Sequence, residues 1–117
     1  MRAATANQLG DLTVTALPGI DPRRTHDMEF FPGLRKGWSL VAMTNELDAP
    51  TGRTAGSLGW AGLANTYFWI DRRAQIAGVW ATQLFPFADP VALHAAMEFE
   101  TSVYRAMNSG AGIGPTS

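Results

Sequence analysis

Residues 56–71 constrain the fold of this chain more than any other segment, because they join three glycines to a long apolar run. The run is rich in aromatic and β-branched side chains over residues 65–71, which is typical of a strand buried in a sheet. Glycine inside a strand weakens it, and it marks a bulge or a place where a ligand or another backbone comes close. The segment therefore predicts a strand that is either a core element with a bulge or the wall of a binding site.

The rest of the chain predicts an α+β fold, with an antiparallel sheet and a C-terminal helix packed on one face. Residues 1–8 read as the end of a helix, and residues 18–36 as a long irregular connection. Strands are expected at residues 12–17, 37–44, 58–70 (broken by its glycines) and 76–84, with a tight turn at 71–74. Strands so close in sequence pair as an antiparallel meander.

The C-terminal helix is expected to begin at Asp89 and Pro90, because Asp caps helix N-termini and Pro suits the first turn. Its apolar residues recur at helical spacing and predict the face that packs on the sheet. That stripe consists of Ala92, Ala96, Phe99, Val103 and Met107. The small, Gly-rich residues 109–117 are expected to be a flexible tail, which leaves residues 1–108 as one partial domain.

Composition excludes several classes of function. Charged residues make up 16% of the chain, below the usual quarter, as in a piece of a larger folded unit or an oligomer subunit. A net charge of −1 gives no case for binding nucleic acid, and no apolar stretch is long enough to span a membrane. The chain has no cysteine and no Gly-rich phosphate loop, so no cofactor is expected. The start lacks an apolar leader, which makes the cytoplasm the default location.

Four sequence motifs together resemble a known family. Trp60-Ala61-Gly62 is followed by the run of residues 65–71, then by residues 78–83 and by the Phe-Pro-Phe-Ala-Asp-Pro stretch at 85–90. This order of motifs is similar to the C-terminal portion of the β-lactamase-related serine hydrolases. That family includes the class C β-lactamases and the esterases and transesterases built like them. The resemblance extends over residues 7–107.

The resemblance implies a role for Trp60, Ala61, Gly62 and Leu63. They stand where the family has its third motif, which borders the acyl pocket, so they are the expected substrate-binding residues. The amide of Leu63 would be one oxyanion-hole donor, and the substrate of the complete protein would be a small-molecule ester, amide or lactam. The sequence departs from the family turn at Arg72, often Pro, and at Gln75, often Gly.

The catalytic motifs of that family are missing from this chain. The nucleophile requires Ser-x-x-Lys, but Gly33 stands three residues before the only lysine, Lys36. Ser102 has Arg105 at that spacing, and arginine cannot act as the base. Neither tyrosine has an asparagine two positions on. No catalytic residue is therefore assigned, and the chain is expected to be inactive alone.

The alternative function is a non-catalytic sheet-and-helix module that binds a partner or self-associates through a strand edge.

Metal binding has weaker support. His26 lies near Asp27 and Glu29, but a charged, solvated loop explains them better without a second histidine close by. His94 and Glu98 are one helical turn apart and are expected to be an exposed pair. No metal site is assigned.

If residues 60–62 form the rim of an open cleft, apolar surface should be exposed around them. The expectation covers Trp60 itself and two aromatic residues that lie elsewhere in the sequence, Phe30 and Phe85.

Overall fold

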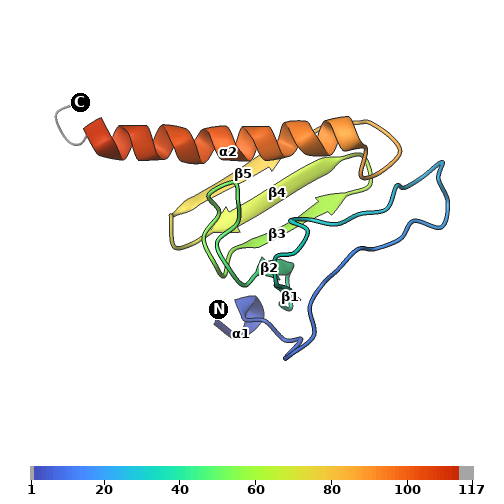
Figure 1. Ribbon diagram of the computed structural model, residues 1–117, viewed down its shortest axis with the longest axis horizontal. Helices are drawn as coiled ribbons and strands as arrows, with labels where there is room; N and C mark the ends of the chain where they lie inside the picture. Colours follow the sequence, from blue (N-terminus) through green and yellow to red (C-terminus); the bar gives the residue numbers. More distant parts are fainter. Residues whose placement is uncertain (1, 114–117) are drawn as a thin grey trace.

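A computed structural model describes residues 2–113 of the chain, which form one five-stranded antiparallel sheet and a long helix (Figure 1). The strands are β1 (Lys36–Trp38), β2 (Met43–Asn45), β3 (Leu58–Gly62), β4 (Thr66–Asp71) and β5 (Ile76–Trp80), and they are adjacent in that order. A short helix, α1 (Arg2–Thr5), precedes the sheet, and α2 (Pro90–Ile113) follows it. The predicted α+β class and antiparallel meander are confirmed.

The β3–β4 and β4–β5 hairpins form the regular part of the sheet. Leu58 pairs with Ile70 at one end of β3–β4, and Asp71 pairs with Ile76 where β5 begins. The predicted turn after β4 is present, and Gln75 has a φ of 59° there. Glycine adopts that left-handed conformation most easily, which fits the glycine often found at this position in the family that the chain resembles.

The predicted strand at residues 37–44 is wrong as a single element, because a tight turn divides it into β1 and β2. The Ser39 hydroxyl oxygen accepts bonds from the amides of Val41 and Ala42, each at 3.0 Å. The amide of Ser39 also donates to the carbonyl of Ala42 at 2.9 Å. A serine side chain that bonds local backbone in this way favours a turn over a continuous strand.

Three other strand predictions need correction. Residues 58–70 form two strands with a turn between them, and β5 ends at Trp80, short of the predicted residue 84. Residues 12–17 form no strand. Leu17 makes an isolated bridge to Met28, and the Val14 amide donates to the Lys36 carbonyl at 2.7 Å.

Helix α2 lies across the sheet and starts as predicted, since the carboxylate of Asp89 accepts the amide of Ala92 at 2.9 Å. The face of α2 that is buried differs from the predicted one, because Glu100 and Tyr104 are buried together with Ala92 and Ala96. Phe99, Val103 and Met107 are only half-buried. The helix continues to Ile113; residues 114–117 of the predicted tail lie outside the described residues, and the domain boundary stays a prediction.

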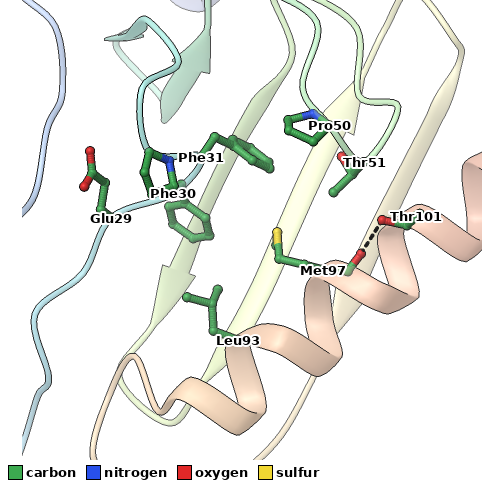
Figure 2. Close-up of a pocket in the computed structure, with 9 residues that line it drawn as sticks. Glu29, Phe30, Phe31, Pro50, Thr51, Leu93, Met97 and Thr101 are labelled. Atoms are coloured by element: carbon green, nitrogen blue, oxygen red, sulfur yellow. Dashed lines mark hydrogen bonds between the residues drawn. The ribbon is translucent and has the colours of Figure 1, made fainter.

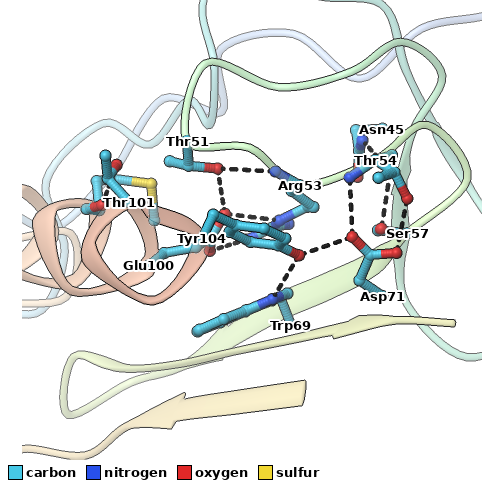
Figure 3. Close-up of polar contacts among 11 residues, drawn as sticks. Asn45, Thr51, Arg53, Thr54, Ser57, Trp69, Asp71, Glu100, Thr101 and Tyr104 are labelled. Atoms are coloured by element: carbon cyan, nitrogen blue, oxygen red, sulfur yellow. Dashed lines mark hydrogen bonds and ion pairs between the residues drawn. The ribbon is translucent and has the colours of Figure 1, made fainter. Parts of the chain in front are cut away.

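A buried ion pair fastens the loop before β3 to α2 (Figure 3). Arg53 is 2% exposed and Glu100 1% exposed, and their Nη2 and Oε1 atoms are 2.5 Å apart. Arg53 Nε donates to the other carboxylate oxygen at 3.0 Å, and the Thr51 hydroxyl donates to the same oxygen. The guanidinium also lies 5.1 Å from the centre of the Phe31 ring. The carboxylate and guanidinium are thus paired and hydrogen-bonded, as buried charges need to be.

A second polar cluster joins the same loop to β4 and α2 (Figure 3). Asp71 accepts the amide and hydroxyl of Thr54 at 2.9 and 2.6 Å, the Ala74 amide at 3.0 Å and the Tyr104 hydroxyl at 2.7 Å. The Tyr104 oxygen in turn accepts Trp69 Nε1 at 3.0 Å. Burial alone would raise the pKa of Asp71, but these donors hold that pKa at about 2. Asp71 is therefore an ionised structural carboxylate.

Within residues 2–113, no helix is both long enough and apolar enough to cross a membrane.

Candidate functional site

The predicted substrate-binding residues 60–63, called the wall from here on, end in the turn between β3 and β4. The amide of Asn65 donates to the carbonyl of Gly62 at 3.1 Å, and Asn65 has a φ of 61°. A turn that closes with a left-handed residue is the usual three-residue hairpin loop, and asparagine tolerates that conformation. Gly62 is exposed and Leu63 is 57% exposed, so this end of the wall faces solvent.

Asn65 holds this turn against the segment that leads into α2. Its side chain is fully buried, and Nδ2 donates to the carbonyls of Leu84 at 2.9 Å and Pro86 at 2.8 Å. Its Oδ1 accepts the Tyr67 hydroxyl at 2.8 Å and the Asp89 amide at 3.0 Å. All four hydrogen-bonding positions of the amide are used. Asn65 therefore fixes the wall relative to the start of α2.

Tyr67 belongs to this support and not to a proton-transfer site. Its hydroxyl donates to Asn65, and the ring is 3% exposed. Burial, with a smaller contribution from the charge of Asp89, raises the pKa of Tyr67 to about 12. A phenol with this pKa stays protonated at neutral pH.

The amide of Leu63 is an open donor. Within residues 2–113 it makes no hydrogen bond, since Gly62 pairs with Thr66 and the turn is closed by the amide of Asn65. An unpaired amide beside an exposed glycine can donate to a carbonyl oxygen brought in from solvent. Gly62 leaves room for that approach: a Cβ built on it would lie 4.0 Å from the nearest atoms, which belong to Thr66.

Trp60 is half-buried and anchors the other end of the wall. Its ring lies 4.7 Å from the Trp38 ring and 5.7 Å from the Phe30 ring, measured between centroids. The expectation that Phe30 is exposed is wrong, because it is 5% exposed and packs under Trp60 and against Tyr67. Phe30 thus fills the space that an open cleft beside Trp60 would need.

Apolar side chains are exposed on the opposite side of the turn. Phe85 is 61% exposed, as expected, and Leu84 is 52% exposed. The Leu84 amide donates to the carbonyl of Ala64 at 3.2 Å, which holds the backbone of this segment beside the turn. Exposed apolar side chains therefore stand on both of the segments that meet at this turn.

The larger cavities lie elsewhere. One of about 370 Å³ lies between α2, the Phe30–Phe31 loop and the Pro50–Thr51 loop, and Met97 lines it from α2 (Figure 2). Trp60 lines a small pocket of about 10 Å³, and neither pocket is lined by Ala61, Gly62 or Leu63. Whether the wall binds a substrate stays a prediction.

The other sequence candidates are not brought together. Lys36 is buried, and its Nζ donates to the carbonyls of Phe31 at 2.9 Å and Leu34 at 2.8 Å. Burial lowers the pKa of Lys36, and the charge of Glu29 partly opposes this. His26 and His94 are exposed, and residues 2–113 contain no group of three acidic or histidine side chains able to hold a metal ion.

Sequence reasoning missed Asn65 as the organising residue of the site. Its signal was present: an asparagine follows Gly-Leu-Ala between two strands, at the left-handed position of a three-residue hairpin loop. A long strand prediction over residues 58–70 concealed that turn.

Comparison with known proteins supports the resemblance. No protein-family model matches the chain. The unliganded structure of simvastatin synthase (LovD) from Aspergillus terreus matches with a TM-score of 0.63 and 29% identity, over 66% of this chain and 20% of the synthase. Its LovD6 mutant matches with a TM-score of 0.64 and 28% identity over the same shares. The acyltransferase calJ of Penicillium decumbens is 42% identical over 45 residues, which are 38% of this chain and 10% of that protein.

The chain thus spans only a small part of the proteins that it matches. The sheet and the C-terminal helix of this chain have the arrangement that was expected from the Trp60-Ala61-Gly62 motif and the run after it. Over 66% of its length, this chain has the β-lactamase-like serine hydrolase fold of simvastatin synthase, and a 45-residue segment is similar to a protein named as an acyltransferase.

Proposed function

We propose that this chain supplies the substrate-binding wall of a β-lactamase-like acyl-transfer enzyme, and that it lacks the nucleophile. The observation that carries the proposal is the open amide of Leu63, next to an exposed glycine in a turn that Asn65 holds in place. The similarity to calJ adds support, because that protein is named as an acyltransferase, and the likeness to simvastatin synthase supplies the fold.

The proposed chemistry uses the backbone more than the side chains. The Leu63 amide would donate to the carbonyl oxygen of a small ester, amide or lactam as negative charge develops on it. Gly62 would let that carbonyl come close to the strand, and Trp60 and Ala61 would complete the wall. The exposed side chains of Leu63 and Phe85 favour an apolar acyl group.

The serine nucleophile and its lysine would have to come from polypeptide outside these 117 residues. Without them no acyl-enzyme can form, and one of the two oxyanion donors is missing as well, because it is the amide of the nucleophile itself. This chain therefore contributes substrate binding, and turnover needs the polypeptide that carries the nucleophile.

The purified chain is expected to hydrolyse neither p-nitrophenyl butyrate nor nitrocefin above the rate of a buffer control. The measurement is turnover with and without a serine-reactive phosphonate, followed by mass spectrometry of the protein. A matched Ser102→Ala variant should behave identically, because Ser102 has no lysine partner. Turnover that the phosphonate abolishes, with a label on any serine of the chain, would contradict the proposal.

A second candidate function is a non-catalytic module that self-associates or binds a partner through a strand edge. One observation favours it: within the described residues, the outer edge of β5 is not paired with any strand.

A further inference from the structure

The turn that carries the Leu63 amide has few bonds of its own. Gly62 pairs with Thr66 at the end of the β3–β4 ladder, and the Asn65 amide donates to the Gly62 carbonyl at 3.1 Å. An oxyanion donor stabilises developing charge only if it is held in place before the substrate arrives. Contacts from outside the turn are therefore needed to hold the Leu63 amide.

The segment after β5 lies beside this turn. The last ladder pair between β4 and β5 joins Tyr67 to Trp80, and residues 81–84 continue as irregular chain. The Leu84 amide then donates to the Ala64 carbonyl at 3.2 Å. Ladder pairing thus stops one strand residue short of the turn, and side chains make the remaining contacts.

The hydroxyl of Thr82 makes the shortest of these contacts. It donates to the carbonyl of Ala64 at 2.6 Å and also lies 3.0 Å from the carbonyl of Asn65. These carbonyls belong to the two residues that directly follow Leu63. A hydroxyl has one hydrogen, so the bond to Ala64 is the main one and the second carbonyl shares it. Thr82 thus binds both peptide groups on the C-terminal side of Leu63.

Thr66 fixes the backbone from which the Thr82 hydroxyl projects. The Thr66 hydroxyl donates to the Thr82 carbonyl at 3.3 Å, and the Thr82 amide lies 3.4 Å from the same hydroxyl oxygen. Threonine is branched at Cβ, which restricts its χ1 angle. With its backbone held at this register, the Thr82 hydroxyl therefore has few directions available other than toward the turn.

Thr82 and Asn65 act on different atoms of the turn. The Asn65 side chain bonds the segment that leads into α2, including the carbonyls of Leu84 and Pro86. The Thr82 hydroxyl bonds the backbone carbonyls of the turn itself. Loss of the Thr82 hydroxyl would leave every bond of the Asn65 side chain in place, so the two contributions can be separated by substitution.

We propose that Thr82 is a positioning residue of the acyl-transfer site, whose hydroxyl holds the Leu63 amide in the orientation in which it donates to a carbonyl oxygen. Thr82 acts through the carbonyls of Ala64 and Asn65 and supports a site whose motif, residues 60–63, does not include it. A donor aligned in this way depends on such supporting hydrogen bonds. The inference rests on the proposed function.

The inference predicts an amide that is open to solvent and yet rigid. In NMR experiments on the full chain, the Leu63 amide hydrogen is expected to exchange rapidly with water, because it has no partner among the described residues. Its backbone order parameter should nevertheless be about 0.85, the value of a rigid backbone. Thr82→Ala should lower the Leu63 order parameter below about 0.6, the range of a flexible backbone.

Thr82→Ser is the rescue variant, because it differs from Thr82→Ala by the hydroxyl alone. It should restore the order parameter of Leu63. Thr101→Ala is the matched control: Thr101 is half-buried like Thr82, but its hydroxyl donates to the Met97 carbonyl within α2 at 2.8 Å. This control should leave the Leu63 order parameter unchanged. The urea midpoint of unfolding reports the stability of each variant separately, and Thr82→Val replaces Thr82→Ala if that variant does not fold.

An unchanged Leu63 order parameter in Thr82→Ala would overturn the inference, even if the urea midpoint falls, because Thr82 would then stabilise the fold without positioning the amide. An equal loss of order in Thr82→Ser would overturn it, as would a Leu63 amide that is already flexible in the unmodified chain. None of these measurements involves turnover, so their failure leaves the acyl-transfer proposal standing, whereas a catalytic test of the Leu63 amide bears on that proposal alone.

Discussion

Replacing Glu100 by alanine is expected to lower the free energy of unfolding by about 3–5 kcal/mol, because it leaves the Arg53 guanidinium buried without its partner. Arg53 is 2% exposed and has Glu100 as its ion-pair partner. The same change removes the acceptor of the Thr51 hydroxyl, so the loop at residues 49–57 loses its direct bonds to Glu100 on α2. Urea denaturation followed by tryptophan fluorescence measures the loss.

The matched control replaces both members of the pair. In Arg53→Met with Glu100→Leu, no charge is left buried, and apolar replacement of a buried pair is often neutral or stabilising. The double variant should therefore regain most of the stability lost by Glu100→Ala. If Glu100→Ala has the same urea midpoint of unfolding as the unmodified protein, the ion pair does not stabilise the loop.

Gly78→Ala is expected to destabilise the protein by about 1–3 kcal/mol through overpacking. A Cβ at this position would overlap the Trp69 ring. That ring cannot easily move, since its Nε1 donates to Tyr104 at 3.0 Å and its centroid lies 5.9 Å from that of the Phe99 ring, in an edge-type arrangement. Thermal unfolding measures the change, and the Trp69 environment can be followed in the near-ultraviolet circular dichroism spectrum.

Gly62→Ala is the comparison that makes this result specific. Gly62 is also a strand glycine, but a Cβ there meets only Thr66, at 4.0 Å. Its replacement should change the stability by less than about 0.5 kcal/mol, as for an ordinary surface substitution. Equal losses at the two positions would mean that the crowding around Trp69 does not set the requirement for glycine at residue 78.

Local signals in the sequence were sufficient for much of the fold. The apolar runs of β4 and β5, with a tight turn between them, predicted a hairpin, and Asp89-Pro90 located the start of α2. These features depend on neighbouring residues, so the sequence shows them directly. The turn at Ser39 was missed because its side chain competes with a strand that the apolar pattern otherwise favours.

The buried polar residues could not be predicted in the same way. The helical spacing of apolar residues predicts that Phe99 and Val103 lie on the buried face of α2, whereas the structure buries Glu100 and Tyr104. Those two polar groups are buried because Arg53 and Asp71, distant in sequence, satisfy them. Spacing within one helix contains no information on such partners. Likewise, Phe30 lies in an irregular connection, and only the tertiary structure shows that it packs under Trp60.

We propose that the Leu63 amide serves as an oxyanion donor in a complete acyl-transfer site. It is tested most directly in a chimera of Aspergillus terreus simvastatin synthase that carries residues 58–80 of this chain in place of the corresponding strands. The comparison is Leu63→Pro, which removes the amide hydrogen, against Leu63→Ala, which keeps it. Proline is favoured at this position of a turn, so the backbone should tolerate the change.

We expect that Leu63→Ala stays within about threefold of the unmodified chimera in kcat for simvastatin formation, while Leu63→Pro loses about 10²–10³-fold. Circular dichroism should show that both are folded to the same extent. Equal kcat values for the proline and alanine variants, in a chimera that is active, would contradict the claim that this amide faces the reacting carbonyl.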